Sequence, residues 1–245
     1  GGEKVDNIPD IDFRCEIENE NEDKVEMYLY GSIVDQKPVH FLTGEEIEGD
    51  YIYPKKVRDM VNEAGDKDIE LHINSKGGQV FASVPIHNFL KQVDNQVTVY
   101  VDGIAASGAS IIAMAGNEVI MPDNTNLMIH QARGGVFGTA EDMLEFAENL
   151  GKIDESVINS YASRFKGSKD ELKKLISDET WLTAEEAVTL GLADKVLDEE
   201  EVKDGEVEDS ENSIDIKANL LAKFGENNEP ADKDSVKENL LSQFK

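Results

Sequence analysis

The feature that most constrains the fold is an alternation of short apolar strands with helix-forming segments. The strands are runs of Val, Ile and aromatic residues, whereas the helical segments between them carry apolar residues three and four positions apart. Parallel strands need such a crossover between them. The sequence therefore predicts an α/β fold with a mostly parallel sheet. Strands are expected at residues 25–31, 69–74, 97–102, 118–121 and 126–130, and helices begin near Pro54, after Gly78, at Ser107 and at Thr139.

Helix-capping signals mark the second half of the same region. Thr139 begins a long amphipathic pattern, and Ser168 with Glu171 and Thr183 with Glu186 form two capping boxes. The apolar stripe of the long helix is wider than a single sheet contact requires, which predicts an additional subunit interface. The stripe consists of Met143, Phe146, Ala147, Leu150, Ile153, Val157 and Tyr161.

Composition divides the chain into three parts. Residues 1–24 are polar and are expected to be partly flexible, residues 25–197 hold the strand and helix patterns, and residues 198–245 form an acidic tail. The tail has too little apolar surface to offset the entropy lost on ordering it. One folded domain followed by a flexible tail is therefore predicted.

The charge balance excludes several classes of partner. With 24 Lys and Arg against 52 Asp and Glu, the net charge is −28. A nucleic acid or an anionic membrane surface must be met by cations, so neither partner is expected. No run of about 18 apolar residues and no signal-peptide pattern is found. The single cysteine, Cys15, allows no internal disulfide and no zinc-ligand spacing. The sequence predicts a soluble cytoplasmic protein without metal or cofactor.

Three candidate reactive features stand at the carboxyl ends of predicted strands, where open α/β sheets place their sites. Gly77-Gly78 leaves backbone N–H groups exposed, although such pairs also form simple tight turns. Ser107 lies at a small-residue strand-to-helix turn, like a nucleophile elbow, although G-x-S-x-G is absent and a plain N-cap is the alternative. His130 is either a satisfied core histidine or the base that activates a serine. The other three histidines, His40, His72 and His87, lack such a setting, and structural roles are assigned to His72, in mid-strand, and His87, on a helix face.

Four ordered motifs make this sequence resemble the ClpP serine peptidase family. They are Asn74-Ser75-Lys76-Gly77-Gly78, Ala105-Ala106-Ser107, Met128-Ile129-His130-Gln131, and Trp181-Leu182-Thr183-Ala184-Glu185-Glu186-Ala187 with Gly191-Leu192-Ala193-Asp194. The resemblance covers roughly Val25 to Val196 and implies a ClpP/crotonase-like spiral of βαβ units. Residues 100–107, 114–116 and 179–184 further resemble the phage-encoded branch, whose members act as head maturation (prohead) proteases.

Carried over position by position, the resemblance implies a serine endopeptidase. Ser107 corresponds to the nucleophile and His130 to the general base. Gly78 and Gly108 correspond to the two backbone donors of the oxyanion hole. The segments that pair with an extended peptide substrate read its backbone more than its side chains. These segments correspond to Gly77-Gly78 and Gly134-Gly135.

The third member of the triad departs from the family pattern. The usual aspartate precedes an aromatic-Leu-Ser/Thr-Ala segment, and counting back from Trp181 without a gap leads to Glu179. We assign Glu179 because glutamate also orients the histidine in some hydrolases, and Asp178 is the alternative if the turn shifts by one residue. Lys76 stands where the family commonly has proline, which loosens the turn but leaves the Gly78 amide available.

The resemblance also implies partners. It predicts a homo-oligomer, as a ring, in which the helix from Thr139 corresponds to the "handle" that helps join two rings. The amino end does not match the loops that dock an ATPase ring, and no nucleotide-binding loop is found. Two other interpretations stay open: a crotonase-type acyl-CoA enzyme of the same fold, and a ClpP-fold assembly or scaffold protein without activity. The Ser-His pair and a matching acid favour the peptidase.

A short motif occurs twice in the acidic tail. Residues 216–224 (IKANLLAKF) recur as residues 236–244 (VKENLLSQF), at a constant offset of 236 − 216 = 20. Apolar positions four apart would share a helix face, although each copy is too short to be stable alone. The copies are either transient helices that bind nothing or paired docking motifs for a capsid, scaffold or portal-type partner, or for the protein's own body. A phage-encoded protease would act in the host cytoplasm or within an assembling procapsid.

Overall fold

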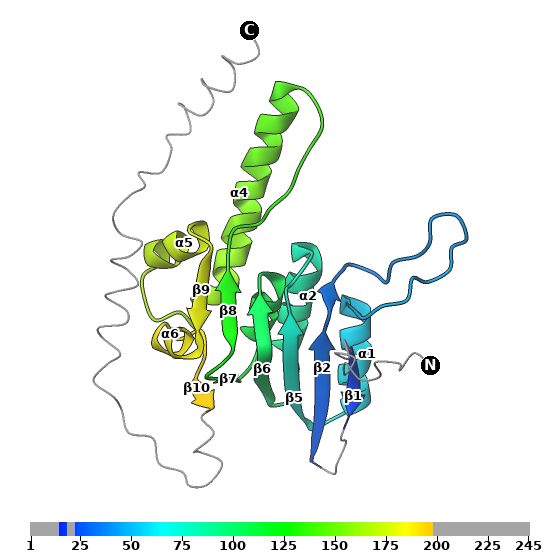
Figure 1. The fold of residues 1–245 in the computed structure, drawn as a ribbon, viewed down its shortest axis with the longest axis vertical. Coiled ribbons are helices and arrows are strands. Elements are labelled where there is room, and N and C mark those ends of the chain that lie inside the picture. Colours follow the sequence, from blue (N-terminus) through cyan, green and yellow to red (C-terminus); the bar gives the residue numbers. More distant parts are fainter. Residues whose placement is uncertain (1–14, 19–22, 198–245) are drawn as a thin grey trace, which may run out of the picture.

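The computed structural model describes residues 15–18 and 23–197, which form a sheet with helices packed against it (Figure 1). The predicted acidic tail and its repeated motif lie outside the described residues. The strands are β1 (Cys15–Glu18), β2 (Lys24–Tyr30), β3 (Ser32–Ile33), β4 (Tyr51–Ile52), β5 (Asp68–Ser75), β6 (Val97–Ala106), β7 (Glu118–Pro122), β8 (Asn126–Ile129), β9 (Thr180–Thr183) and β10 (Lys195–Leu197). The helices are α1 (Pro54–Ala64), α2 (Val80–Leu90), α3 (Gly108–Ala113), α4 (Ala140–Ala162), α5 (Lys169–Ser177) and α6 (Ala184–Thr189).

The main sheet forks at its long central strand, β6. Its strand order is β1-β2-β5-β6-β7-β10, and β8 also pairs with β6 and then with β9. The first half of β6 pairs with β7 through Thr98–Tyr100, and its last three residues pair with β8. All of these pairings are parallel except β1 with β2 and β8 with β9. The predicted α/β fold with a mostly parallel sheet is confirmed.

Local sequence signals account for most element boundaries. Pro54 is the first residue of α1, and the buried face of this helix carries Val57, Met60, Val61 and Ala64. The caps predicted at Ser168 and Thr183 are complete capping boxes, and Thr139 forms a third with Asp142. The sixth strand runs to Ala106 rather than Asp102, because its small final residues pair with β8.

The sheet begins earlier than the pattern starting at Val25 suggested. Within the segment 1–24, residues 15–18 form β1, which is antiparallel to β2. Cys15 is buried in this strand, with its Sγ 3.8 Å from the Met60 sulfur on α1. Burial raises the pKa of the Cys15 thiol to about 11. The cysteine is therefore a neutral core residue rather than a reactive thiolate.

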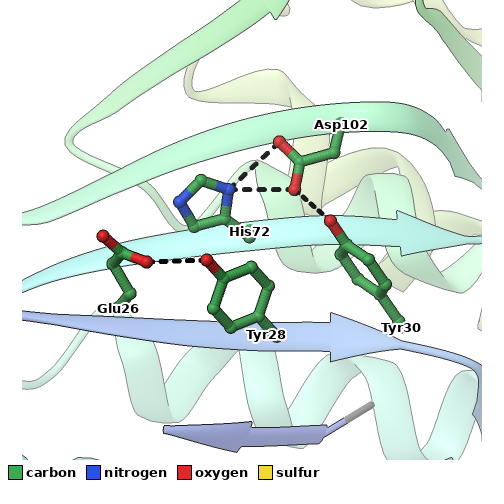
Figure 2. Close-up of polar contacts among 5 residues, drawn as sticks. All are labelled: Glu26, Tyr28, Tyr30, His72 and Asp102. Carbon is green, nitrogen blue, oxygen red and sulfur yellow. Dashed lines mark hydrogen bonds and ion pairs between the residues drawn. The ribbon is translucent and has the colours of Figure 1, made fainter. Parts of the chain in front are cut away.

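The face of the sheet opposite the buried residues of β5 carries an aromatic and acidic cluster (Figure 2). His72 lies between the rings of Tyr28 and Tyr100, with centroids 4.8 and 5.0 Å away and rings stacked within 20°. Its Nδ1 is 2.9 Å from the carboxylate of Asp102, which also accepts a hydrogen bond from the Tyr30 hydroxyl at 2.5 Å. These side chains join β2, β5 and β6 across their register.

The longest helix, α4, is only partly packed against the body. Its buried residues, Val157, Ile158, Ser160 and Tyr161, all lie in the second half, and the first half projects beyond the sheet (Figure 1). Of the predicted apolar stripe, Met143, Phe146, Leu150 and Ile153 are partly exposed. None of the described helices, α4 included, has the length and hydropathy needed to cross a membrane.

Candidate active site

Ser107 lies at the turn between β6 and α3 in an unusual backbone conformation. Its φ of 53° with ψ of −122° belongs to the sparsely populated regions whose strain is about 1–3 kcal/mol. Two contacts hold it there: its amide donates to the Met128 carbonyl at 2.9 Å, and the Ser110 hydroxyl donates to the Ser107 carbonyl at 2.6 Å. A strained serine at a strand-to-helix turn has the geometry of a nucleophile elbow.

The imidazole of His130 faces this serine. Because β8 runs parallel to the end of β6, the residue that follows β8 reaches the Ser107 turn. Nε2 of His130 lies 2.7 Å from Oγ of Ser107. If the hydroxyl donates to Nε2, the ring proton of the neutral imidazole is on Nδ1, an assignment that follows from the hydrogen-bond pairing.

The surroundings of His130 favour its neutral form. Burial lowers its pKa most, Arg133 lowers it further, and the carboxylates of Glu179 and Asp154 raise it. A neutral imidazole is the form that can accept a proton. The Nδ1 atom is buried and has no hydrogen-bond partner among the described residues. An unsatisfied buried N–H costs about 1–3 kcal/mol, so an acceptor at this atom would stabilise the ring, above all when it is protonated.

Strand register brings Glu179 toward this atom. β8 and β9 are antiparallel, with Ile129 opposite Thr180, so one further step along the same register leads to His130 opposite Glu179. The Cβ atoms of such facing residues are about 4.5–5.5 Å apart. Asp178 is the C-cap of α5, one residue further from this row. The register favours Glu179 over Asp178, although neither carboxylate is hydrogen-bonded to the imidazole.

The Glu179 carboxylate is bound instead to Arg133, a residue that the sequence did not single out. Nη2 of Arg133 donates to Oε2 of Glu179 in a short ion pair. The two side chains are 68% and 41% exposed, and a pair so open to solvent contributes at most about 1 kcal/mol. Glu179 and Ser107 are the two non-glycine residues with positive φ in the described part of the chain. Such strained positions cluster at functional sites.

Two glycine amides converge beside Ser107. Within the described ranges, neither the Gly78 nor the Gly108 N–H has a hydrogen-bond acceptor. A Cβ on Gly108 would lie 3.4 Å from the Gly78 nitrogen, so the two amides are close. A Cβ on Gly78 would lie 2.0 Å from the Ile33 carbonyl, and one on Gly77 2.5 Å from the Ala106 carbonyl. Only glycine allows the segment 77–78 to approach β3 and the Ser107 turn so closely.

A cavity of about 320 Å³ opens at this point. The Ser107 and His130 side chains, Gly78 and Gly108 line its polar part, and Arg133 lies on its wall. The described residues include no group of three or more His, Cys, Asp or Glu placed to hold a metal ion. The apolar wall of the cavity includes Ile33, Val80, Ile111, Val157 and Tyr161.

The second expected substrate edge lies outside this cavity. Gly134 and Gly135 are exposed, on the segment that joins β8 to α4. A Cβ on Gly134 would come within 2.7 Å of a side chain of α4, whereas nothing lies within 4 Å of one on Gly135. The start of the segment is tied to α4 by Asp154, whose carboxylate accepts from the Ala132 amide at 2.7 Å. The role of these two glycines in peptide binding stays a prediction.

A serine and a histidine in hydrogen-bond contact beside two converging amides are the parts of a serine hydrolase. The Clp protease family model matches residues 45–200, which is 156 of the 245 residues. The chain belongs to the Clp protease family. Membership implies serine-type peptidase chemistry, and members are typically ring-shaped oligomers that act on protein substrates. The match favours the peptidase interpretation over the acyl-CoA one.

The strained Ser107 backbone predicts that glycine is more stabilising than alanine at this position. Ser107→Gly should raise the free energy of unfolding above that of Ser107→Ala by about 1 kcal/mol, because relief of the strain exceeds the extra chain entropy of glycine. Urea unfolding measures the difference. The same pair at Ser163, a helical C-cap with φ of −71°, should show the opposite order. Equal stability of the two Ser107 variants would contradict the prediction.

Proposed function

We propose that this protein is a serine endopeptidase in which Ser107 is the nucleophile and His130 the general base. The observation that carries the proposal is the 2.7 Å contact between Ser107 Oγ and His130 Nε2 inside the region that matches the Clp protease family. Gly78 and Gly108 are the proposed oxyanion donors, and Glu179 is the proposed acid. The neutral imidazole, which its lowered pKa favours, suits proton transfer near neutral pH.

In the first half of the reaction, Ser107 Oγ bonds to the carbonyl carbon of the substrate while its proton passes to His130 Nε2. The carbonyl oxygen becomes an oxyanion, which the Gly78 and Gly108 amides stabilise as donors fixed before the reaction begins. The C–N bond then breaks, and Nε2 returns its proton to the leaving amine. An ester between Ser107 and the acyl part of the substrate remains.

In the second half, water gives a proton to His130 Nε2 and bonds to the ester carbon. The same two amides stabilise the second oxyanion. The ester bond to Ser107 breaks, the proton returns from the imidazole to Oγ, and the carboxylic acid product leaves. Glu179 on Nδ1 would stabilise the imidazolium that forms in both halves. The apolar cavity wall of Val80, Ile111 and Val157 favours an apolar side chain next to the scissile bond.

Substitution of the three proposed catalytic side chains tests this function. Ser107→Ala and His130→Ala should each lower peptide hydrolysis by up to about 10⁶-fold, and Glu179→Ala by less, on the order of 10⁴-fold. Asp178→Ala should hydrolyse peptides at close to the rate of the parent protein, because Asp178 is the C-cap of α5 and not part of the proposed triad. Hydrolysis of fluorogenic peptides measures the rates.

A fluorophosphonate probe gives an independent reading of the same proposal. The parent protein should be labelled at Ser107, and Ser177→Ala, at the exposed end of α5, is the matched control that keeps both label and activity. Label on Ser107→Ala would contradict the nucleophile assignment. Loss of activity in Asp178→Ala with retention in Glu179→Ala would contradict the choice of acid.

We further propose that the subunits form a homo-oligomeric ring in which the projecting half of α4 makes contacts between subunits. This half carries the partly exposed Met143, Phe146 and Leu150. Phe137, on the segment leading into α4, is fully exposed at 104% of its reference area. Apolar side chains gathered so far from the protein's own core are typical of an interface.

An acidic substitution at Phe137 should weaken the oligomer. Phe137→Asp removes no contact with the core, so it should leave the unfolding transition unchanged while light scattering at micromolar concentration reports a smaller particle. Asn62→Asp, on the exposed face of α1, adds the same charge elsewhere and should keep the parent mass. A parent protein that is monomeric at this concentration would overturn the proposal.

The finer proposal is a phage head maturation protease that acts on capsid, portal or scaffold proteins in the host cytoplasm or in an assembling procapsid. The motifs at residues 100–107 and 179–184, which resemble that branch of the family, support it. The repeated motif at 216–224 and 236–244 would then recruit the enzyme to the shell, since two tethered copies raise the effective concentration.

Co-expression with a capsid shell precursor tests this assignment. Mass spectrometry should find the precursor trimmed with the parent protein and intact with Ser107→Ala. Deletion of residues 198–245 should reduce trimming and leave hydrolysis of small peptides unchanged. An untrimmed precursor beside an enzyme that cleaves peptides would reject the phage assignment but not the peptidase.

A further inference from the structure

The candidate base and an arginine compete for one carboxylate. Arg133 lies three residues after His130 on the segment that follows β8, and both line the same cavity as Ser107. The Glu179 carboxylate is bound to the Arg133 guanidinium, while Nδ1 of His130 is buried and has no acceptor in the described part of the chain. The serine and the base are therefore in contact before the acid has joined them.

The Arg133–Glu179 pair is open to exchange. Both side chains are substantially exposed, so water screens the pair and little free energy opposes its separation. Nδ1 is a more enclosed position, where a carboxylate would satisfy a buried donor. The register of β8 with β9 leads to Glu179 opposite His130, so a side-chain rotation without strand movement can bring the carboxylate over.

A second anion at Arg133 would favour this exchange. The guanidinium binds carboxylates through paired N–H donors, and a carboxylate held beside it on a bound peptide acts at high effective concentration. Once that anion satisfies Arg133, Glu179 is free to accept from Nδ1. A ligand shifts an equilibrium between two states only when it binds one of them better. An acidic peptide meets this condition, because it binds the Arg133 guanidinium in the state in which Glu179 has moved away.

We propose that Arg133 is a specificity-determining residue that binds an acidic side chain of the peptide substrate near the scissile bond, and thereby releases Glu179 to His130. This inference rests on the proposed peptidase function. Substrates with Asp or Glu within two residues of the cleaved bond would complete the triad as they bind. Neutral substrates would meet an enzyme whose acid is still held by Arg133.

Peptide pairs that differ only in charge test the inference. Four positions are varied one at a time, the two before and the two after the scissile bond. One series of fluorogenic peptides carries Glu at the varied position, and the matched series carries Gln there. At one position or more, the parent protein should prefer Glu by at least about tenfold in kcat/KM, partly through kcat because the acid acts on the chemical step. Raising the salt concentration should reduce the preference.

Removal of the guanidinium separates this role from a purely structural one. Arg133→Gln should abolish the preference for Glu by raising the hydrolysis of the Gln peptides, since Glu179 is then available to His130 for every substrate. A structural residue would lower both series together. The matched control is Arg58→Gln on α1, where the guanidinium lies over the Phe89 ring, and it should retain the preference of the parent protein.

The pH profile gives a second reading with a fixed sign. Hydrolysis needs neutral His130, so the rate rises with pH through the pKa of this group. Arg133 lowers that pKa and Glu179 raises it. Arg133→Gln should therefore move the acid limb of kcat/KM to higher pH, and Glu179→Gln should move it to lower pH. Arg58→Gln should leave the limb in place.

The possible outcomes distinguish failure of the Arg133 role from failure of the proposed peptidase function. Equal hydrolysis of every Glu and Gln pair by a parent protein that is labelled at Ser107 overturns the role of Arg133 and leaves the peptidase standing. Equal loss of both series in Arg133→Gln also overturns it. If the parent protein cleaves no peptide and Ser107 takes no label, the peptidase function fails, and the inference fails with it.

Discussion

The position of β8 between β6 and β9 is the constraint on which the candidate site depends. β8 is parallel to the end of β6, with Ala106 beside Met128, and antiparallel to β9, with Ile129 opposite Thr180. One step beyond these pairs, the registers lead to Ser107 beside Ile129 and to Glu179 opposite His130, so Ser107 and the His130–Glu179 pair occupy adjacent rows. A slip of one residue in either pairing would turn the histidine to the other face. Burial of Leu127, Ile129 and Leu182 opposes such a slip.

The turn at Ser107 is held from both faces of the sheet. On one face, the close approach of Gly77 and the Ser110 hydroxyl fix the strained turn at Ser107. On the other face, Asp102 fixes β6 five residues upstream, through its contacts with His72 and Tyr30 (Figure 2). Backbone strain persists only where the surrounding structure over-determines the conformation. The contacts of Asp102 and the close approach of Gly77 thus both restrain the strand that ends at the Ser107 turn.

Much of the fold and the centre of the site could be predicted from sequence because both depend on local signals. The glycine pair, the small-residue turn and the histidine each stand at a strand end, so chain order alone suggests that they meet. The β1 strand was missed because Glu16 and Glu18 make its pattern polar, whereas its pairing with β2 and the burial of Cys15 stabilise it.

Arg133 could not have been found in this way. Its importance arises from a tertiary contact with a residue 46 positions away, and an arginine after a strand carries no signal of its own. The same holds for Asp154, which anchors the chain after His130 from the middle of α4. Arg133 lowers the pKa of His130 and Asp154 raises it. The balance of the two effects depends on distances that only the folded chain defines.

The site combines a rigid half with an adjustable half, and the difference lies in what holds each half: backbone hydrogen bonds in the first and an exposed side-chain ion pair in the second. The Ser107 turn is fixed by the hydrogen bond from its amide to the Met128 carbonyl, and residues 77–79 are fixed by two backbone hydrogen bonds with Ile33. The Glu179 carboxylate is at the surface, in an ion pair that water weakens. Side chains so exposed change rotamer far faster than strands move. The Glu179 carboxylate is therefore the part of the site that moves most readily, because its displacement leaves Ser107, His130 and the two glycine amides in register.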